Sequence, residues 1–330
     1  MKKIKVTIFL LIGINAYIFS QDSISTDIFK PSGKAFAKIF TNFHSDFYED
    51  DNSSAFEITR GYFGYKYDLS KNFSTKICLD IGNPEIGKYE QIAYLKNALL
   101  SYKANKLTVN FGLIGLYQFK TQETNWYHRY LYKSFQDAYK FGSSADLGIS
   151  IKYDLINFIS LDGAILNGEG YKELQSDNTY KGAFGLTVKP LKGLILRAYY
   201  DLMQKTETQS TIATFIAYSN KKFSVGIEYN MQNNHDIVKG QDYSGFSIYS
   251  SYQIKEKFGV FGRYDNLSSE KINGATDAWN IAKDGQFFIA GFEFAPVKGL
   301  KIAPNYQGRQ PTKSEKSLVS SVYLNLEIKF

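Results

Sequence analysis

Apolar and polar residues alternate strictly in several segments of the chain. In one of them, Phe73, Thr75, Ile77, Leu79 and Ile81 alternate with Ser74, Lys76, Cys78 and Asp80. The same period runs through 223–230 and 317–330. Because successive side chains of a β-strand point to opposite faces, this period predicts strands with one apolar and one polar face. Each segment is about 10 residues long, which spans a bilayer when the strand is tilted by about 45°. Strands of soluble sandwiches are typically nearer 5–6 residues.

The predicted connections between these strands alternate in length. Short ones fall at 68–72, 104–106, 154–157, 190–193, 219–222, 255–257 and 296–299. Longer ones fall at 46–55, 83–93, 118–142, 167–179, 204–210, 231–242, 267–285 and 309–317. Short turns on one side and long loops on the other are typical of an up-and-down membrane barrel. Seven short and eight long connections join sixteen strands, an even number that places both termini on the periplasmic side.

The pattern therefore predicts an all-β fold: a closed antiparallel up-and-down transmembrane β-barrel of about 16 strands, whose long third loop folds inward. After residue 20 no run of 18 or more apolar residues occurs, so no transmembrane helix is expected. The competing fold is a periplasmic or secreted sandwich. A Greek-key sandwich would not produce such a regular alternation of short and long connections.

Composition agrees with strands and membrane interfaces. Aromatic residues make up 16% of the 330 residues, with 26 Tyr and 26 Phe but 2 Trp. Tyr and Phe are favoured in strands, and aromatic belts lie at membrane interfaces. The single cysteine, Cys78, excludes an intrachain disulfide framework and a multi-cysteine metal site. We expect neither a metal nor a cofactor.

The first residues resemble a secretory signal peptide. A basic start, 1–5, precedes an apolar stretch, 6–19, and cleavage is expected near Ser20 and Gln21. The predicted organisation is a signal peptide at 1–20 and an outer-membrane β-barrel domain at 21–330. A retained membrane anchor is the alternative, but the apolar run is short and Asn15 interrupts it. Cleavage would lower the net charge from +7 to +4, a mild balance that gives no argument for nucleic-acid binding.

The segment 323–330 alternates apolar residues and ends in the aromatic Phe330. This arrangement resembles the terminal signature of bacterial outer-membrane barrels, which the outer-membrane assembly machinery reads during insertion. We therefore expect Phe330 to act as an assembly signal.

Five stretches, occurring in the same order, resemble the phosphate-selective porin O and P family in the form common among Bacteroidetes-type bacteria. They are 56–65, 106–112, 128–135, 164–170 and 260–267. The similarity covers most of 34–330. It implies a 16-stranded porin in the Gram-negative outer membrane, with a homotrimer as one assembly. It does not transfer the substrate, because phosphate selectivity in that family depends on ladders of inward arginines and lysines, and this chain has few candidates.

The longest loop, 118–142, carries the candidate pore constriction. Its aromatic content is high for a solvated outer loop, because exposed apolar patches are costly or interactive. If the loop packs against the inner wall, four residues can line the narrowest point: Lys120, His128, Arg129 and Lys133. Fixed positive charge there would favour anions over cations. The alternative is that Arg129 pairs with a wall carboxylate and only pins the loop.

Charged residues that alternate with apolar neighbours should face the lumen, because a charge on the lipid face costs about 2–4 kcal/mol at mid-membrane. The expected basic lumen-wall residues are Arg60, Lys66, Arg197 and Arg263. The acidic ones are Asp80, Asp162, Asp201, Glu228 and Glu293. Because both basic and acidic residues are expected on this face, the sequence indicates a water-filled interior with salt bridges.

An enzymatic function is not expected. The chain has three histidines, and His44-Ser45-Asp46 cannot form a catalytic relay alone because neighbours in a strand point to opposite faces. The sequence contains no nucleophile-elbow, zinc-protease or nucleotide-binding signature.

The sequence thus predicts an outer-membrane porin, a water-filled diffusion channel for small hydrophilic solutes or ions with a weak anion preference. The alternative is a non-conducting barrel that serves as an adhesion, surface or secretion-complex scaffold, with the loop 268–280 displaying Trp279. The expected partners are outer-membrane lipids and lipopolysaccharide, the assembly machinery and a homotrimer, with no nucleic acid.

Overall fold

The computed structural model describes residues 29–48, 51–83, 91–313 and 317–330. Residues 31–330 belong to one compact unit. The predicted signal peptide, 1–20, lies outside the described residues.

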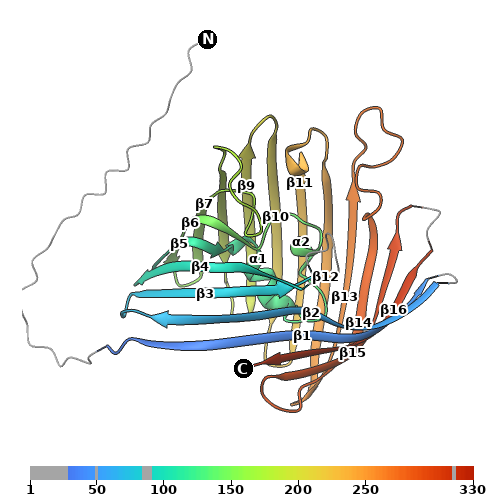
Figure 1. Cartoon of the computed structure of the whole chain (residues 1–330), viewed down its shortest axis with the longest axis horizontal. Coiled ribbons are helices and arrows are strands. Elements are labelled where there is room, and N and C mark those ends of the chain that lie inside the picture. Colours follow the sequence, from blue (N-terminus) through green and yellow to red (C-terminus); the bar gives the residue numbers. More distant parts are fainter. Residues whose placement is uncertain (1–28, 49–50, 84–90, 314–316) are drawn as a thin grey trace, which may run out of the picture. The chain divides into compact units, whose positions relative to one another are not determined.

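Sixteen strands form one closed antiparallel barrel, as predicted (Figure 1). The first eight are β1 (Ser32–Tyr48), β2 (Asp51–Asp68), β3 (Phe73–Gly82), β4 (Ile92–Ala104), β5 (Leu107–Gly115), β6 (Ala145–Ile156), β7 (Ile159–Leu166) and β8 (Lys181–Val188). The others are β9 (Leu194–Gln204), β10 (Thr208–Ser219), β11 (Phe223–Asn233), β12 (Tyr243–Lys255), β13 (Phe258–Ser269), β14 (Gly285–Phe294), β15 (Leu300–Pro311) and β16 (Val319–Lys329). Each strand pairs with its sequence neighbours, and β1 closes the sheet by pairing with β16.

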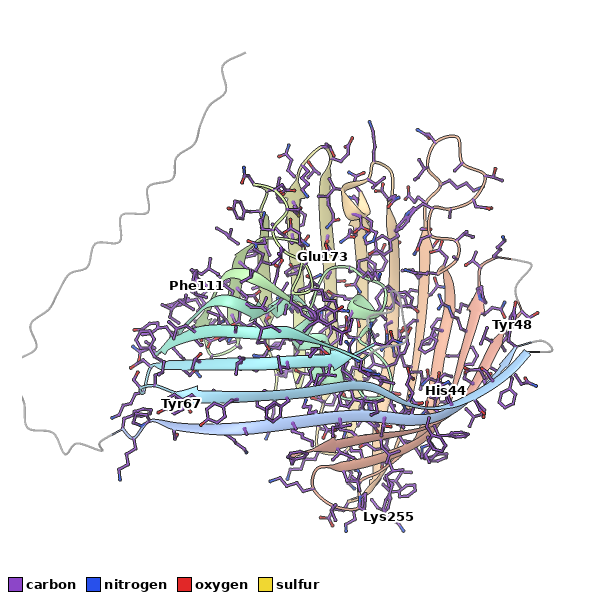
Figure 2. All side chains as sticks on the ribbon, in the orientation of Figure 1. His44, Tyr48, Tyr67, Phe111, Glu173 and Lys255 are labelled. Atoms are coloured by element: carbon purple, nitrogen blue, oxygen red, sulfur yellow. The ribbon has the colours of Figure 1, made fainter. Side chains whose placement is uncertain are left out.

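Alternation in the sequence becomes alternation in burial. On β9, Arg197, Tyr199 and Asp201 are buried, whereas Leu196 and Tyr200 are exposed. The buried positions face the barrel interior and the exposed positions face outward. Large apolar side chains recur on the outward face, among them Phe111, which is 65% exposed (Figure 2).

Two of the predicted long connections are wrong. β1 ends at Tyr48 and β2 begins at Asp51, while β9 ends at Gln204 and β10 begins at Thr208. In both places polar residues continue the cross-strand pairing, so the strands lengthen and the loops shorten. β1 and β2 reach 17 and 18 residues, and Tyr67 and Tyr48 mark the two ends of their hairpin (Figure 2).

The helices lie in the connections. The connection from β5 to β6 contains α1 (Tyr117–Trp126) and α2 (Phe135–Ala138), and η1 (His235–Ile237) follows β11. Among the described residues, no helix is long and apolar enough to cross a membrane.

The closing seam includes the last residue. The N–H of Ala37 donates to the carbonyl of Phe330 at 2.9 Å, and the N–H of Phe330 donates to the carbonyl of Ala37 at 3.2 Å. The Phe330 side chain is 74% exposed.

Candidate functional site

The connection between β5 and β6, residues 116–144, packs across the barrel interior. Trp126, Tyr130 and Leu131 are buried in one apolar cluster with residues from distant strands. Those strand residues are Phe40, Phe215, Ala217, Tyr249, Phe261, Phe287, Ile289 and Ala303. Most of them belong to β10 and β12–β15, which we call the packed wall. Because the barrel is closed, a segment that reaches these inward positions lies inside the lumen.

A second aromatic cluster holds the end of this connection. Phe135, Tyr139 and Phe141 pack with Tyr243 and Leu267. The ring of Trp279 packs against the same cluster, and its Nε1–H donates to the carbonyl of Asp242 at 2.8 Å. Trp279, the residue proposed to display a partner surface, is thus engaged in packing between loops.

Polar contacts attach the inserted connection to the packed wall. The hydroxyl of Tyr130 donates to Glu293 at 2.8 Å. Arg263 donates to the backbone carbonyl of Lys133 at 2.6 Å and also pairs with Asp265 at 2.6 Å. These contacts involve buried groups, so they fix the connection more firmly than surface pairs would.

The predicted constriction residues have different surroundings. Arg129 pairs with Asp137 at 3.2 Å, a partner within the same connection and not on the wall. Burial alone would raise the pKa of Asp137, but the nearby Arg129 and Lys133 outweigh it and lower that pKa. Lys120 is exposed, with its Nζ 5.7 Å from the ring centre of Tyr117. Lys133 is partly exposed.

His128 is buried, with 4% of its surface exposed. Its Nδ1 lies 2.8 Å from the carbonyl of Trp126, so this nitrogen carries the proton and donates. Its Nε2 lies 3.5 Å from a carboxylate oxygen of Glu293. Burial lowers the pKa of His128 to about 4, although Glu293 opposes the shift. The ring is therefore neutral at pH 7 and adds no charge to the lumen.

Three of the four predicted wall bases form ion pairs inside the barrel; Arg197 and Arg263 are buried, and Arg60 is partly buried. Arg60 lies 3.2 Å from Asp80, and Arg197 lies 2.6 Å from Asp162. Arg263 is the third, paired with Asp265. Lys66 differs, because its pair with Asp68 at 3.1 Å is exposed and lies near the short connection from β2 to β3.

A cavity of about 490 Å³ lies between α1 and the wall formed by β1–β5, which we call the open wall. We call this cavity the lysine pocket, because Lys38, Lys76, Lys96 and Lys120 line it against one acidic residue, Glu123. Among the described carboxylates, only Asp80 is ion-paired with one of these lysines, at 3.4 Å from Lys96. The Nζ of Lys76 donates to Asn97 at 2.9 Å. This side of the lumen therefore carries uncompensated positive charge.

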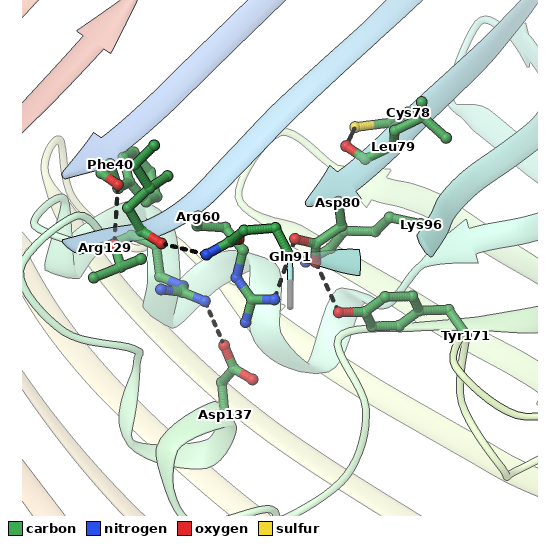
Figure 3. Close-up of polar contacts among 12 residues, drawn as sticks. Phe40, Arg60, Cys78, Leu79, Asp80, Gln91, Lys96, Arg129, Asp137 and Tyr171 are labelled. Carbon is green, nitrogen blue, oxygen red and sulfur yellow. Dashed lines mark hydrogen bonds and ion pairs between the residues drawn. The ribbon is translucent and has the colours of Figure 1, made fainter. Parts of the chain in front are cut away.

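A charged cluster around Asp80 adjoins the pocket (Figure 3). Arg60 and Lys96 pair with this carboxylate, and the hydroxyl of Tyr171 donates to it at 2.8 Å. Burial raises the pKa of Tyr171, so the phenol stays protonated as a donor. Arg129 and Asp137 lie beside Arg60 in the same view.

Sequence reasoning missed Lys38, Lys76, Lys96 and Tyr171 as site residues. Lys76 lies in a segment of alternating apolar and polar residues, so the inward orientation of its side chain could have been predicted from that alternation. Lys96 sits at a register shift, because Cys78 pairs with Asn97 and Leu79 with Leu95. The extra residue interrupts the alternation from which inward-facing and outward-facing positions are assigned.

The three residues 44–46 do not form a relay. His44 contacts Asn42 at 2.9 Å and Asp46 at 3.6 Å. Ser45 alternates with both and points to the opposite face. Within the described ranges, no group of three or more His, Cys, Asp or Glu is arranged to hold a metal ion.

No family model and no curated protein sequence matches the chain. Solved structures match its fold at low identity. OmpF of Salmonella typhi in complex with daunomycin has a TM-score of 0.70 at 11% identity, covering 90% of this chain and 97% of that chain. The outer membrane channel DcaP of Acinetobacter baumannii also has a TM-score of 0.70 at 11% identity, covering 91% and 97%. The trimer form of OmpT, an outer membrane protein of Vibrio cholerae, has a TM-score of 0.61 at 12% identity, covering 91% and 99%. The chain therefore shares the fold of these outer-membrane barrels.

Proposed function

We propose that the chain forms an outer-membrane porin, a diffusion channel for small hydrophilic solutes and ions with a weak preference for anions. Two features support the channel. The barrel has an apolar outward face with a polar, charged interior. Its fold is similar to that of a protein described as an outer membrane channel.

The observation that carries the anion preference is the lysine pocket. Four lysines and one glutamate line it, whereas Arg263 of the packed wall and Arg197 of β9 are each matched by a carboxylate. Charges more than about 8–10 Å apart are screened at physiological salt, so charge lining the passage should dominate selectivity. Fixed positive charge lowers the barrier for anions. Arg129, which its ion pair with Asp137 partly neutralises, then contributes less than Lys38, Lys76 and Lys120, which have no ion pair among the described residues.

The proposed location is the outer membrane of a Gram-negative cell, reached by export with a cleaved signal peptide. The outward apolar face would contact outer-membrane lipids and lipopolysaccharide. Phe330 would be the assembly signal read by the insertion machinery. A homotrimer fits this proposal, since a protein of similar fold is described in a trimer form.

Planar lipid bilayers test the proposal directly. We expect the conductance to increase in steps. In a salt gradient, we expect the reversal potential to shift modestly toward the equilibrium potential of the anion. Lys38→Glu and Lys76→Glu should each move it toward cations, and Arg129→Glu should move it by a smaller amount. Lys66→Glu is the matched control, because Lys66 is exposed and outside the pocket.

Two outcomes would contradict the proposal in different ways. Equal reversal potentials in all four variants, with conductance intact, would show that the lysine pocket does not cause the anion preference. The absence of conductance from correctly folded wild-type barrels would favour the non-conducting adhesion, surface or secretion-complex scaffold.

A further inference from the structure

The connection between β7 and β8 also turns into the lumen. At its start, the N–H of Asn167 donates to the carbonyl of Leu147 at 2.9 Å, and the N–H of Gly168 donates to Asp146 at 2.8 Å. Gly170 has φ +87°, and a Cβ there would lie 2.6 Å from the Ser143 side chain. The backbone at 167–170 is thus packed tightly against the end of the first inserted connection.

Tyr171 follows this anchored turn and reaches a distant strand. Its hydroxyl donates to Asp80 of β3 at 2.8 Å, although β4, β5 and β6 separate β3 from β7 in the sheet. Its ring stands at 88° to the ring of Tyr94 with 6.5 Å between centres, and the Nζ of Lys96 lies 5.2 Å from its centre. The connection from β7 to β8 therefore reaches past three intervening strands to contact β3 (Figure 3). We call this contact the Tyr171 bridge.

The Tyr171 bridge lies on the outer side of the lysine pocket. Lys76 and Cys78 line the pocket, and Asp80 is the next inward residue of β3 toward its long connection to β4. On β2, Tyr62 lines the pocket and Arg60 is the next inward residue toward the same side. A solute that moves from the long connections toward the pocket therefore meets the bridge first.

Tyr171 adds no charge to the bridge, because its phenol is uncharged. The charge there comes from Arg60 and Lys96, which both pair with Asp80. The ring thus occupies space without adding charge, so it should discriminate solutes by their size and not by the sign of their charge.

We propose that residues 167–173 form a second inserted segment and that Tyr171 determines the size limit of the passage along the open wall. This inference rests on the proposed channel function. The phenol hydrogen bond to Asp80 holds the ring across the passage, and cation–π contact with Lys96 supports it. The discriminated solutes are neutral hydrophilic molecules such as sugars of increasing size.

Single-channel conductance and liposome swelling test this role. Tyr171→Ala should raise the conductance by about 1.5-fold or more, because conduction depends on pore diameter. Larger sugars should then enter the liposomes, and the reversal potential should stay at the wild-type value. Tyr180→Ala is the matched control, since Tyr180 belongs to the same connection and its ring is 60% exposed. It should behave as wild type in all three measurements.

Tyr171→Phe keeps the ring and removes the donor. We expect a mean conductance between those of wild type and Tyr171→Ala, with more frequent fluctuations between two levels because the ring is no longer tied to Asp80. If Tyr171→Ala and Tyr180→Ala have equal conductance and equal sugar limits, the inference is wrong while the channel stands. A folded wild-type barrel without conductance overturns both.

Discussion

The packed wall and the open wall differ in whether their basic side chains have ion-pair partners. On the packed wall, the inserted connection buries inward side chains in an apolar cluster, and Arg263 is matched by Asp265 within hydrogen-bonding distance. In the lysine pocket, Lys38 and Lys76 of the open wall and Lys120 of α1 have no ion-paired carboxylate among the described residues, although Arg60 and Lys96 of the same wall share Asp80. A buried charge without a partner is costly, whereas a charge beside water is tolerated. Where the inserted connection covers the wall, a charged side chain needs an ion-pair partner. Where it leaves a cavity, a charged side chain can stay unpaired and attract or repel solutes.

Arg263→Met should have the largest effect on stability. It would leave Asp265 buried without its partner and remove the donor to Lys133, for a cost of about 3–5 kcal/mol. Heat-modifiability on gels, followed against temperature, measures the loss. Lys76→Met removes the same charge from the open wall and should cost under about 1.5 kcal/mol, the value of one hydrogen bond. Equal losses would contradict the division into a packed and an open wall.

Trp126→Ala tests the apolar part of the packed wall. Trp126 is 2% exposed and packs in the cluster with Tyr249 and Phe261, so its truncation should cost about 3 kcal/mol. The inserted connection should loosen and become more sensitive to added protease. Leu174→Ala is the control, because Leu174 is 86% exposed. Protease sensitivity and heat stability that match this control would show that the connection is held by its polar contacts alone.

His128 should make the packing of the inserted connection sensitive to acid. Its pKa is lowered to about 4 by burial, whereas an unfolded histidine titrates near pH 6.5. The neutral form is favoured in the folded state, so this stability is complete above pH about 6.5 and is lost as the pH falls toward 4. The loss should be about 1–3 kcal/mol, since one pKa unit corresponds to about 1.4 kcal/mol. Comparison of His128→Phe with wild type at pH 7 and pH 4.5 measures it, and an equal acid loss in both proteins would assign the effect to other groups.

The fold was predictable because each strand carries its own period. The closed barrel and the sixteen strands follow from alternation and from connections rich in turn residues, which are local properties. The lengths of the outer connections were less predictable. Polar residues such as Thr208 suit a loop and an exposed strand end equally well, and the pairing partner decides between them.

The site was only partly predictable. Arg197 and Arg263 could be assigned to the interior from alternation, but their partners Asp162 and Asp265 depend on the spacing across strands. The path of the connection after Leu166 depends on close packing of Gly168 and Gly170 with distant side chains. No local period encodes that path, so the contact of Tyr171 with Asp80 could not be foreseen.

Cys78 lines the lysine pocket and is the one cysteine of the chain. A thiol-specific reagent has therefore a single covalent target, and that target lies inside the lumen beside the residues proposed to attract anions. Because a positively lined cleft concentrates negative reagents, the labelling rate depends on the charge of the reagent as well as on its size. Because Cys78 is only 4% exposed, its labelling rate would report how often the side chains around it move apart to admit the reagent, and no residue has to be substituted for that measurement.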